Sequence, residues 1–526
     1  MRAAATVRSL FRGSYTANAL CYGRIVSGSR LFSSKVAGGV TYTFPDGHPS
    51  GSKDGQLGGT LESLDKFKLP PDGYSESSRA EAKRNLQTQL DFGDASKAFK
   101  AKSTGEIFRA IVVLKVCSYE FMVNNATKLM WLSQRFLGKT LSDKLLKSTF
   151  YGQFVAGETT ADVKTRCEKL RESGILSEIA IPLEEDVGEA SEGDRDSIYE
   201  QNINIMIKCV DQTLVISDRS KPLFMQVRIS PLVPPDILVK IGQMVEQGNY
   251  NCDESDPLSI QSFARGLQQN GKMNILIPGL NDEENEYLNK CLQQLDKMAQ
   301  YAVDNDVKVL VDAEYTYLNP AMTLITLALM YKYNRLQPYF FNTYQSYLKA
   351  SQKNISGDIA AAQKLGFCFG VKLVRGAYLD TERARAKNLG YEDPINDTYE
   401  DTSTCYNANL ETMLDNIHRH GNRFNIFVAS HNEESVTLAI EQMRKYGIGP
   451  EDGKVFFAQL LGMCDQVSYA LGQAGYLVYK SLPMGPVQDV IPYLHRRASE
   501  NRSVLAGARR EQELLWGEFK RRMKVA

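Results

Sequence analysis

Eight short apolar runs alternate with longer amphipathic stretches from residue 173 to the C-terminus. Rich in β-branched and aromatic residues, the runs read ILSEIAIPL, LFMQVRIS, KVLVDAEY, PYFFNTYQ, FCFGVKLVRGAY, FNIFVASHN, KVFFAQLLGM and GYLVYKSLP. Runs of this kind, separated by helical segments, are typical of parallel strands joined by crossover helices. Eight of them predict an α/β fold, a closed (β/α)₈ TIM-like barrel. The alternative is an open doubly wound sheet, but the chain contains no GxGxxG phosphate turn.

Three segments are predicted to precede the barrel. Residues 1–45 contain no Asp or Glu, and their arginines are spread among Ser, Ala and Leu, which is typical of a mitochondrial transit peptide. The alternative for these residues is a disordered basic tail. Residues 46–103 are interpreted as a linker because Gly, Ser, Pro and Asp are frequent in their first part. Residues 104–172 are predicted to be helical, and residues 173–526 to form the barrel.

The composition excludes several classes of partner and site. Basic and acidic residues are equal in number, 62 of each, which argues against nucleic acid as a partner. No apolar run reaches the roughly 18 to 20 residues of a membrane helix, so any membrane contact is expected to be peripheral. The nine cysteines form no CxxC pair, and no HExxH or Cys/His cluster occurs. We therefore predict reduced thiols and no catalytic metal.

Polar residues follow the apolar runs at the point where each predicted strand ends. A strand that is buried on both faces has no packing reason to carry them, and barrel enzymes hold their chemistry at this end. Together they predict a polar cavity at the barrel mouth. The residues are Arg228, Ser230, Asp312, Glu314, Asn342, Gln345, Lys372, Arg375, Ser430, His431, Asn432, Gln459, Lys480 and Ser481.

The segment PYLHRRASEN, residues 492–501, is predicted to be a helix with a distinct polar face. At 100° per residue, that face carries Tyr493, Arg496, Arg497 and Glu500. Taken alone, the segment favours an ordinary solvated face.

Seven segments, in order, resemble motifs of the proline dehydrogenase family of mitochondrial flavoenzymes. They are FYGQFVAGET, VDAEYTYLNPA, FNTYQSYLK, FGVKLVRGAYLDTERA, VASHNEES, QLLGMCDQVS and IPYLHRRASENRSV. VYKS followed by ENRSVLAGARREQELL is similar to the hydroxyproline dehydrogenase branch. The resemblance extends over residues 100–522. It implies a distorted (β/α)₈ barrel that binds FAD non-covalently, oxidises the C–N bond of a cyclic imino acid by hydride transfer to flavin N5, and reduces ubiquinone.

The resemblance also implies which residues form the site. Cofactor contacts are assigned to Asp312, Asn342, Lys372, Val374, Arg375, Gly376, Thr402, Ala429, His431, Arg497 and Glu500. The substrate pocket is assigned to Arg228, Leu373, Tyr378, Leu460, Ser481, Tyr493, Arg496 and Arg497. Catalytic roles are assigned to Arg496, Arg497, Tyr493 and Asp312. Guanidinium forks match the carboxylate of an imino acid, and Glu500 lies three and four residues beyond the two arginines, within reach of either.

The chain departs from the family pattern at three of these positions. Arg228 stands where the family usually has Lys, and Asn342 where bacterial relatives carry Gln. Ser481 stands where proline-specific members have Tyr, which opens space for a 4-hydroxyl group beside the ring. The exchange at Ser481 predicts trans-4-hydroxy-L-proline as the substrate, with 1-pyrroline-3-hydroxy-5-carboxylate as product, and L-proline, oxidised to 1-pyrroline-5-carboxylate, as the weaker one.

Three alternatives stay open. L-proline is the main substrate; or the barrel is a lyase with a Schiff base on Lys372 or Lys480; or it is a non-catalytic barrel that binds a partner. The transit-peptide composition and the resemblance together predict a location on the matrix side of the mitochondrial inner membrane, with peripheral association.

Overall fold

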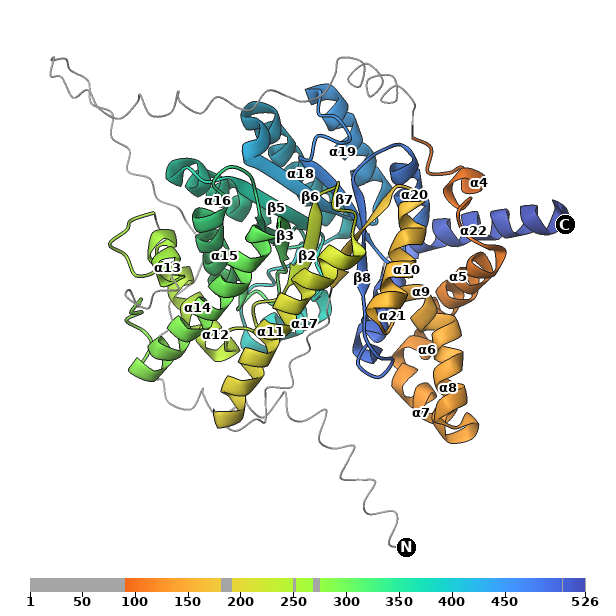
Figure 1. Ribbon diagram of the computed structural model, residues 1–526, viewed down its shortest axis with the longest axis horizontal. Coiled ribbons are helices and arrows are strands. Elements are labelled where there is room, and N and C mark those ends of the chain that lie inside the picture. The colour runs from red at the N-terminus through yellow and green to blue at the C-terminus, as the bar shows by residue number, and fades with distance from the viewer. Residues whose placement is uncertain (1–89, 181–191, 249–251, 268–274, 504, 526) are drawn as a thin grey trace, which may run out of the picture. The chain divides into compact units, whose positions relative to one another are not determined.

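Eight parallel strands form a closed barrel in chain order, as the sequence predicts (Figure 1). The computed structural model describes residues 90–180, 192–248, 252–267, 275–503 and 505–525; the predicted transit peptide and residues 46–89 lie outside this part of the chain. The strands are β1 (Ile175–Ala180), β2 (Leu223–Val227), β3 (Val307–Val311), β4 (Phe340–Gln345), β5 (Phe369–Val374), β6 (Phe424–Ala429), β7 (Val455–Leu460) and β8 (Val478–Pro483). β1 pairs with both β2 and β8, which closes the barrel.

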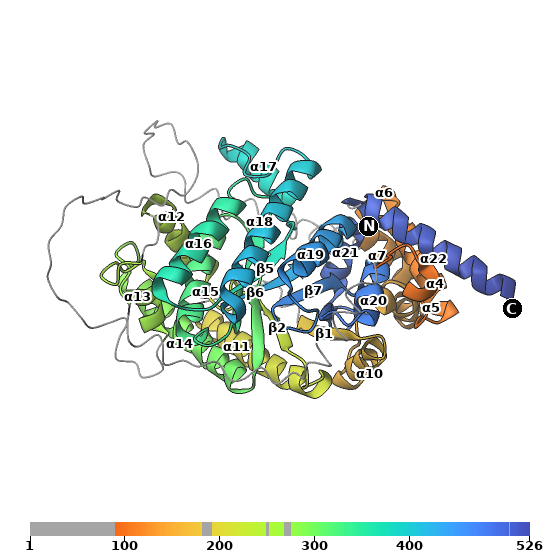
Figure 2. The same cartoon turned by 90° about the horizontal axis from the view of Figure 1, so that it is seen from above.

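Helices connect successive strands and surround the barrel (Figures 1 and 2). They are α11 (Glu192–Ile216) after β1; α12 (Pro235–Gly248), α13 (Ile260–Gly266) and α14 (Asp282–Asp304) after β2; α15 (Asn319–Tyr333) after β3; α16 (Ser351–Leu365) after β4; α17 (Leu379–Leu389) and α18 (Tyr399–His420) after β5; α19 (Glu433–Tyr446) after β6; and α20 (Asp465–Gln473) after β7. Within the described residues, none of the helices has the length and apolar composition that crossing a bilayer requires.

Alternate residues of each strand face opposite sides of the barrel wall. One set packs against the helices in a large apolar core. The other set fills the barrel interior, where the Phe224 ring lies 4.9 Å from that of Phe427, 4.8 Å from that of Phe456 and 5.1 Å from that of Tyr479, centroid to centroid. This aromatic plug fills the N-terminal half of the barrel interior. The C-terminal ends of the strands are the end at which barrel enzymes carry their chemistry.

The N-terminal region consists of short helices. They are α4 (Ala95–Ala98), α5 (Thr104–Cys117), α6 (Glu120–Asn124), α7 (Ala126–Leu137), α8 (Lys139–Leu146), a π-helical turn (Lys147–Tyr151), α9 (Gly152–Phe154) and α10 (Thr160–Arg171). α4 lies inside the segment interpreted as a linker. Ser103 and Thr159 begin α5 and α10 with reciprocal capping boxes to Glu106 and Asp162, which satisfy the first free amides of each helix.

The helix after β8 departs from the regular barrel plan. α21 (Ile491–Ser503) packs against α5 and α6, and α22 (Leu505–Val525) against α4, α5 and α21. Tyr493 and Leu494 of α21 share a separate apolar cluster with Ile107 and Val113 of α5. This is the distortion of the barrel: the eighth helix joins the N-terminal helices instead of the main core.

Candidate active site

Polar side chains form a layer directly above the aromatic plug. Glu178, Gln226 and Ser481 lie two residues after the inward-facing Leu176, Phe224 and Tyr479 on their strands, so alternation directs them into the barrel. By the same alternation, Asp312 follows Leu310, and Lys372 follows Gly370, into the interior. Five polar groups from β1, β2, β5, β8 and the end of β3 therefore converge in one place.

Asp312, at the end of β3, and Lys372, on β5, form a nearly buried ion pair over the intervening strand β4. Lys372 Nζ lies 2.8 Å from Asp312 Oδ1, and the side chains are 9% and 26% exposed. Burial lowers the pKa of Lys372, but the neighbouring carboxylates of Asp312 and Glu178 raise it more, so the net shift is upward. Lys372 is accordingly a fixed cation at the mouth.

Gln226 and Ser481 meet although 255 residues separate them in the chain. Gln226 Nε2 donates to Ser481 Oγ at 3.2 Å. A hydroxyl group has one hydrogen and two acceptor positions. Because Ser481 accepts from Gln226, its own hydrogen stays available for an oxygen that enters the mouth.

Glu178 is the second carboxylate in this layer. It is completely buried on β1, between the strands that carry Gln226 and Ser481. Burial, reinforced by the Asp312 charge, outweighs the effect of Lys372 and raises the pKa of Glu178 to about 7. The group therefore changes charge near neutral pH, inside the barrel.

Glu178→Gln is expected to flatten the pH dependence of stability. The native pKa of about 7 lies above the ordinary 4.5. Between these values the native state binds more protons than the unfolded state, so the free energy of unfolding falls as pH rises through this window. The neutral amide removes this fall and stabilises the protein above pH 7 by about 1–3 kcal/mol. Urea unfolding of both proteins across the window measures the difference.

Glu511 serves as an internal reference for that comparison. Burial and Asp465 raise its pKa to about 7 as well, and the residue is present in both proteins, so its contribution cancels in the difference. Two parallel stability curves would show that Glu178 does not titrate in this window.

Arg228 is held by an internal carboxylate at the end of β2. Its Nη2 lies 3.0 Å from Glu314 Oε2 and 3.4 Å from the Tyr378 hydroxyl. Ser230 Oγ donates to the same Glu314 oxygen at 2.7 Å. The structure thus brings Arg228 and Tyr378 together as expected from the resemblance, but a substrate carboxylate would share Arg228 with Glu314.

Arg375 lies beyond β5 between two aromatic rings. Its guanidinium carbon is 4.9 Å from the Tyr399 ring centroid and 5.4 Å from that of Tyr406. The hydroxyls of Ser403 and Ser435 accept from its two terminal nitrogens at 3.0 and 3.3 Å. Its Nε is buried and has no hydrogen-bond partner among the described residues. Arg375 is therefore fixed in place with one donor unused.

His431 follows β6 and is neutral. Burial, with the charges of Lys480 and Arg497, lowers its pKa to about 3. Its Nε2 accepts the Leu460 backbone N–H at 3.1 Å. In a neutral imidazole the other nitrogen, Nδ1, then carries the proton and can donate. His431 thus joins the ends of β6 and β7 and presents a donor.

The two arginines of α21 have different environments. Arg497 is 9% exposed and its guanidinium carbon lies 4.8 Å from the Tyr493 ring centroid, whereas Arg496 is exposed. Tyr493 and Leu460 belong to the same apolar cluster, which places this ring beside the end of β7. The side chain of Glu500 lies outside the described residues. Consecutive helical residues point 100° apart, which allows the Arg497 guanidinium to face the protein interior while that of Arg496 faces solvent.

Two residues assigned to the site face away from the mouth. Leu373 belongs to the outer core between the sheet and the helices, because its neighbour Lys372 faces inward. Asn342 likewise faces α15, where its Nδ2 lies 3.4 Å from Thr323 Oγ1. Gln345, three residues later, has the inward phase and donates to the Glu314 carbonyl at 3.1 Å. The assignments of Leu373 and Asn342 to the site are therefore corrected, because strand alternation directs both side chains outward. Gln345 lies at the mouth instead of Asn342.

The remaining assigned residues lie at the ends of β5, β6 and α18. Gly376 has a φ of 142°, and a Cβ there would lie 2.4 Å from the Tyr347 ring, so that ring already requires this glycine. Val374 and Ala429 end their strands with the inward phase. Thr402 is in the first turn of α18, next to the Ser403 that holds Arg375, and its hydroxyl donates to the Thr398 carbonyl.

Lys480 faces away from the mouth. It is completely buried, its Nζ lies 2.8 Å from Asp465 Oδ1, and it donates to the Met463 carbonyl at 2.6 Å. Lys102 pairs with the same carboxylate, whose pKa the two lysines lower despite burial. Lys480 therefore anchors α20 to β8 and does not take part in the mouth.

Glu178 and Gln226 belong to the polar layer but are not among the residues predicted from the sequence. Both sit inside apolar runs, ILSEIAIPL and LFMQVRIS, where a buried strand has no packing use for a carboxylate or an amide. The same argument that selected the strand ends would have selected these positions.

The fold is a closed parallel (β/α)₈ barrel with polar and charged side chains at the C-terminal ends of its strands, the end at which barrel enzymes carry their active sites. The proline dehydrogenase family profile matches residues 163–510. A relative from Xenopus laevis named hydroxyproline dehydrogenase is 45% identical over 455 residues, which cover 86% of this chain and 94% of the relative. The human protein named proline dehydrogenase 1, mitochondrial, is 33% identical over 83% of this chain and 90% of its own.

Among solved structures, proline utilization A from Bdellovibrio bacteriovorus has the same fold, with a TM-score of 0.54 at 18% identity; the match covers 84% of this chain and 43% of that one. The chain belongs to the proline dehydrogenase family. Membership supports an oxidoreductase that acts on an imino acid.

Proposed function

We propose that the chain oxidises trans-4-hydroxy-L-proline to 1-pyrroline-3-hydroxy-5-carboxylate, with weaker activity on L-proline. FAD, bound without a covalent link, would supply the hydride acceptor for C5, and ubiquinone on the matrix side of the mitochondrial inner membrane would be the final electron acceptor. The C5–H bond breaks, C5 and nitrogen become doubly bonded, and the nitrogen loses one proton. The relatives named hydroxyproline dehydrogenase and the environment of Ser481 support this substrate.

The donors at the mouth fit a flavin. Lys372 is a buried cation, Arg375 has an unused buried donor, and His431 presents Nδ1–H. A flavin and its pyrophosphate offer many acceptors and negative charge, which such donors match. We assign cofactor binding to these three residues. The other residues assigned to the cofactor are Asp312, Gln345, Val374, Gly376, Thr402 and Ala429.

Arg497 and Tyr493 are proposed to bind the substrate. A buried guanidinium pairs with the carboxylate, and the adjacent Tyr493 ring and Leu460 cover the apolar face of the imino acid ring. These groups come from α21 and from β7, which is two strands along the barrel wall from the β5 strand of Lys372. We infer that they hold the ring against the cofactor and exclude water. Such positioning is what hydride transfer requires.

Ser481 carries the substrate assignment. Its side chain is 6% exposed, lies in the polar layer, and keeps its hydroxyl hydrogen because Gln226 donates to it. A 4-hydroxyl group on the substrate can accept that hydrogen. L-proline leaves the donor unpaired and lacks this bond, which disfavours it.

Anaerobic titration of the purified chain with each imino acid tests the proposal. Hydroxyproline is expected to bleach the flavin absorbance at a concentration about tenfold lower than L-proline. This ratio corresponds to about 1.4 kcal/mol, the net free energy that one neutral hydrogen bond contributes. Ser481→Tyr is expected to reverse the preference by filling the space for the 4-hydroxyl. An unchanged ratio in Ser481→Tyr would exclude Ser481 as the selector, and bleaching by L-proline alone would make it the main substrate.

The lyase alternative is disfavoured by both candidate lysines. A Schiff base requires a neutral amine. Lys372 has a raised pKa and pairs with Asp312, and Lys480 points out of the mouth into its own ion pair. A protein that binds no flavin, and that borohydride links to a carbonyl compound at Lys372, would restore this alternative.

A further inference from the structure

The hairpin of α7 and α8 carries large apolar side chains on its outside. Phe136 is 78% exposed, and Trp131, Leu132, Leu137, Leu141 and Leu145 are each between 38% and 53% exposed. Between the two helices, by contrast, the hydroxyls of Ser133 and Ser142 lie 2.9 Å apart, and Ser142 is buried. Large apolar side chains are therefore exposed on a helix pair whose outer face would usually be polar.

Basic residues are interleaved with these apolar ones on the same faces. On α7, helical spacing puts Lys128, Trp131, Leu132, Arg135 and Phe136 on one face. Arg135 lies over the Trp131 ring, its guanidinium carbon 5.2 Å from the centroid.

On α8, Leu141, Lys144 and Leu145 share a face, and Lys139 begins the helix. From residue 126 to residue 146, four basic residues stand against Asp143 as the one acidic residue. A surface of this kind combines a bilayer-facing apolar side with attraction to anionic lipid.

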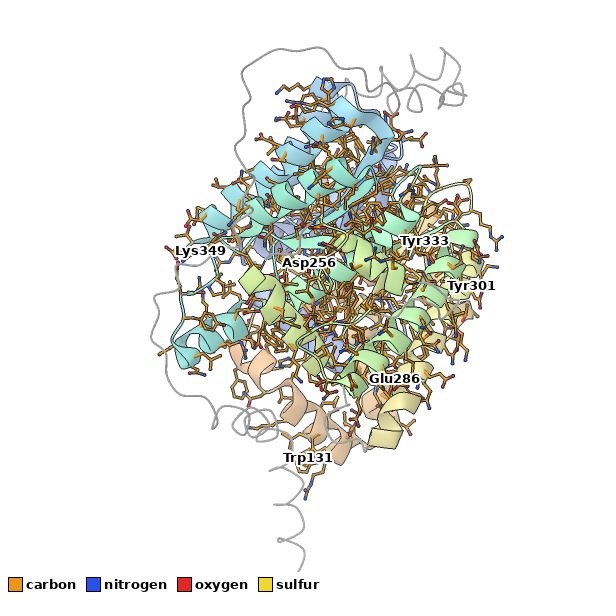
Figure 3. The ribbon with its side chains drawn as sticks, turned by 90° about the vertical axis from the view of Figure 1, so that its left-hand side faces the viewer. Trp131, Asp256, Glu286, Tyr301, Tyr333 and Lys349 are labelled. Atoms are coloured by element: carbon orange, nitrogen blue, oxygen red, sulfur yellow. The ribbon has the colours of Figure 1, made fainter. Side chains whose placement is uncertain are left out.

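The hairpin is joined through α6 to α21, the helix that carries Tyr493 and Arg497. α6 contacts both α7 and α21, and Val123 of α6 lies in the apolar cluster of Tyr493 and Leu494 (Figures 1 and 2). Phe121 of α6, 69% exposed, continues the apolar surface towards α21. Figure 3 shows Trp131 at the outer edge of the helices to which it belongs.

We propose that the outer face of the α7–α8 hairpin docks on an anionic lipid bilayer and holds the barrel mouth beside it. A second copy of the chain is a poorer occupant, because a two-fold interface would set the same cations against one another. This assignment rests on the proposed function in one respect: the electron acceptor is a lipid-soluble quinone, and docking would bring the barrel mouth close to the bilayer that contains it.

Vesicle flotation of the full chain tests the docking. Vesicles of phosphatidylcholine with cardiolipin are compared with phosphatidylcholine alone, using wild type, Phe136→Asp/Leu141→Asp and Lys139→Glu/Lys144→Glu. The matched control is Leu336→Asp, since Leu336 is 77% exposed in the loop between α15 and β4. Wild type and control are expected to float with anionic vesicles, and both hairpin variants to bind at least about tenfold more weakly.

The outcomes separate docking from activity. With a water-soluble electron acceptor, all four proteins are expected to oxidise hydroxyproline equally; with ubiquinone in anionic vesicles, the hairpin variants are expected to be slower. Equal flotation of wild type and Phe136→Asp/Leu141→Asp would overturn the proposal. The proposal would also be overturned if the wild-type protein dimerised through the hairpin and did not float with the vesicles. Inactivity of all proteins with every acceptor, while flotation follows the expected order, would contradict the proposed function and leave the docking supported.

Discussion

Arg497→Met is expected to lower kcat/KM for the imino acid by about 10²–10⁴-fold, while Arg496→Met lowers it about tenfold or less. Arg497 is 9% exposed and packs on Tyr493, whereas Arg496 is exposed. Two charge-assisted hydrogen bonds to a carboxylate contribute about 3–6 kcal/mol when buried, which corresponds to that range. An exposed guanidinium is screened by water and contributes little. Steady-state rates with a soluble acceptor measure both effects.

The same variants need a readout that does not depend on turnover. Flavin content and the thermal unfolding temperature are two such readouts. Both are expected to stay close to the wild-type values in Arg496→Met, because the Arg496 side chain is exposed. Equal losses of kcat/KM in the two variants would contradict the division of roles between the arginines and would favour a symmetric clamp on the carboxylate.

Lys372→Met is expected to destabilise the protein by about 3–5 kcal/mol and to deplete bound flavin. The substitution leaves the Asp312 and Glu178 carboxylates without the cation that neutralises them inside the barrel. The pKa of Glu178 should rise further, because Lys372 is the charge that lowers it. Urea unfolding and the flavin-to-protein ratio measure the two effects.

A second buried ion pair gives a matched control for Lys372. Lys332 of α15 lies 2.6 Å from Asp296 of α14, in the helical layer outside the barrel. Lys332→Met should lose stability and keep its flavin and its kcat/KM. The double variant Lys372→Met/Asp312→Asn should recover part of the stability without recovering the flavin. If Lys372→Met binds flavin normally, the ion pair has only a structural role.

The strands could be predicted from the chain because parallel strands in a barrel are buried on both faces and read as continuous apolar runs. The same property hides which side chains point inward. A run such as FCFGVKLVRGAY shows no alternation of apolar and polar residues, so Leu373 and Lys372 were both assigned to the mouth. The structure separates them, because the period of a strand is two residues.

Contacts between distant strands were equally invisible in the chain. Gln226 and Ser481 meet because β2 and β8 flank β1 in the closed barrel, and register between strands decides which side chains reach one another. The exposed apolar side chains of the α7–α8 hairpin are of the same kind: its residues look like an ordinary amphipathic segment until packing shows that Trp131, Phe136 and Leu141 are exposed.

The sequence by itself determined the eight-stranded barrel, its family and the polar ends of its strands, because hydrophobic periodicity and residue type are local properties of the chain. Only the tertiary structure decided that Arg497 is buried while Arg496 is exposed, that Lys480 faces outward, and that Glu178 shares a layer with Asp312 and Lys372. Those facts depend on strand phase, on register and on the packing of α21 against the N-terminal helices. Each is a relation between segments far apart in the chain, which no local pattern encodes.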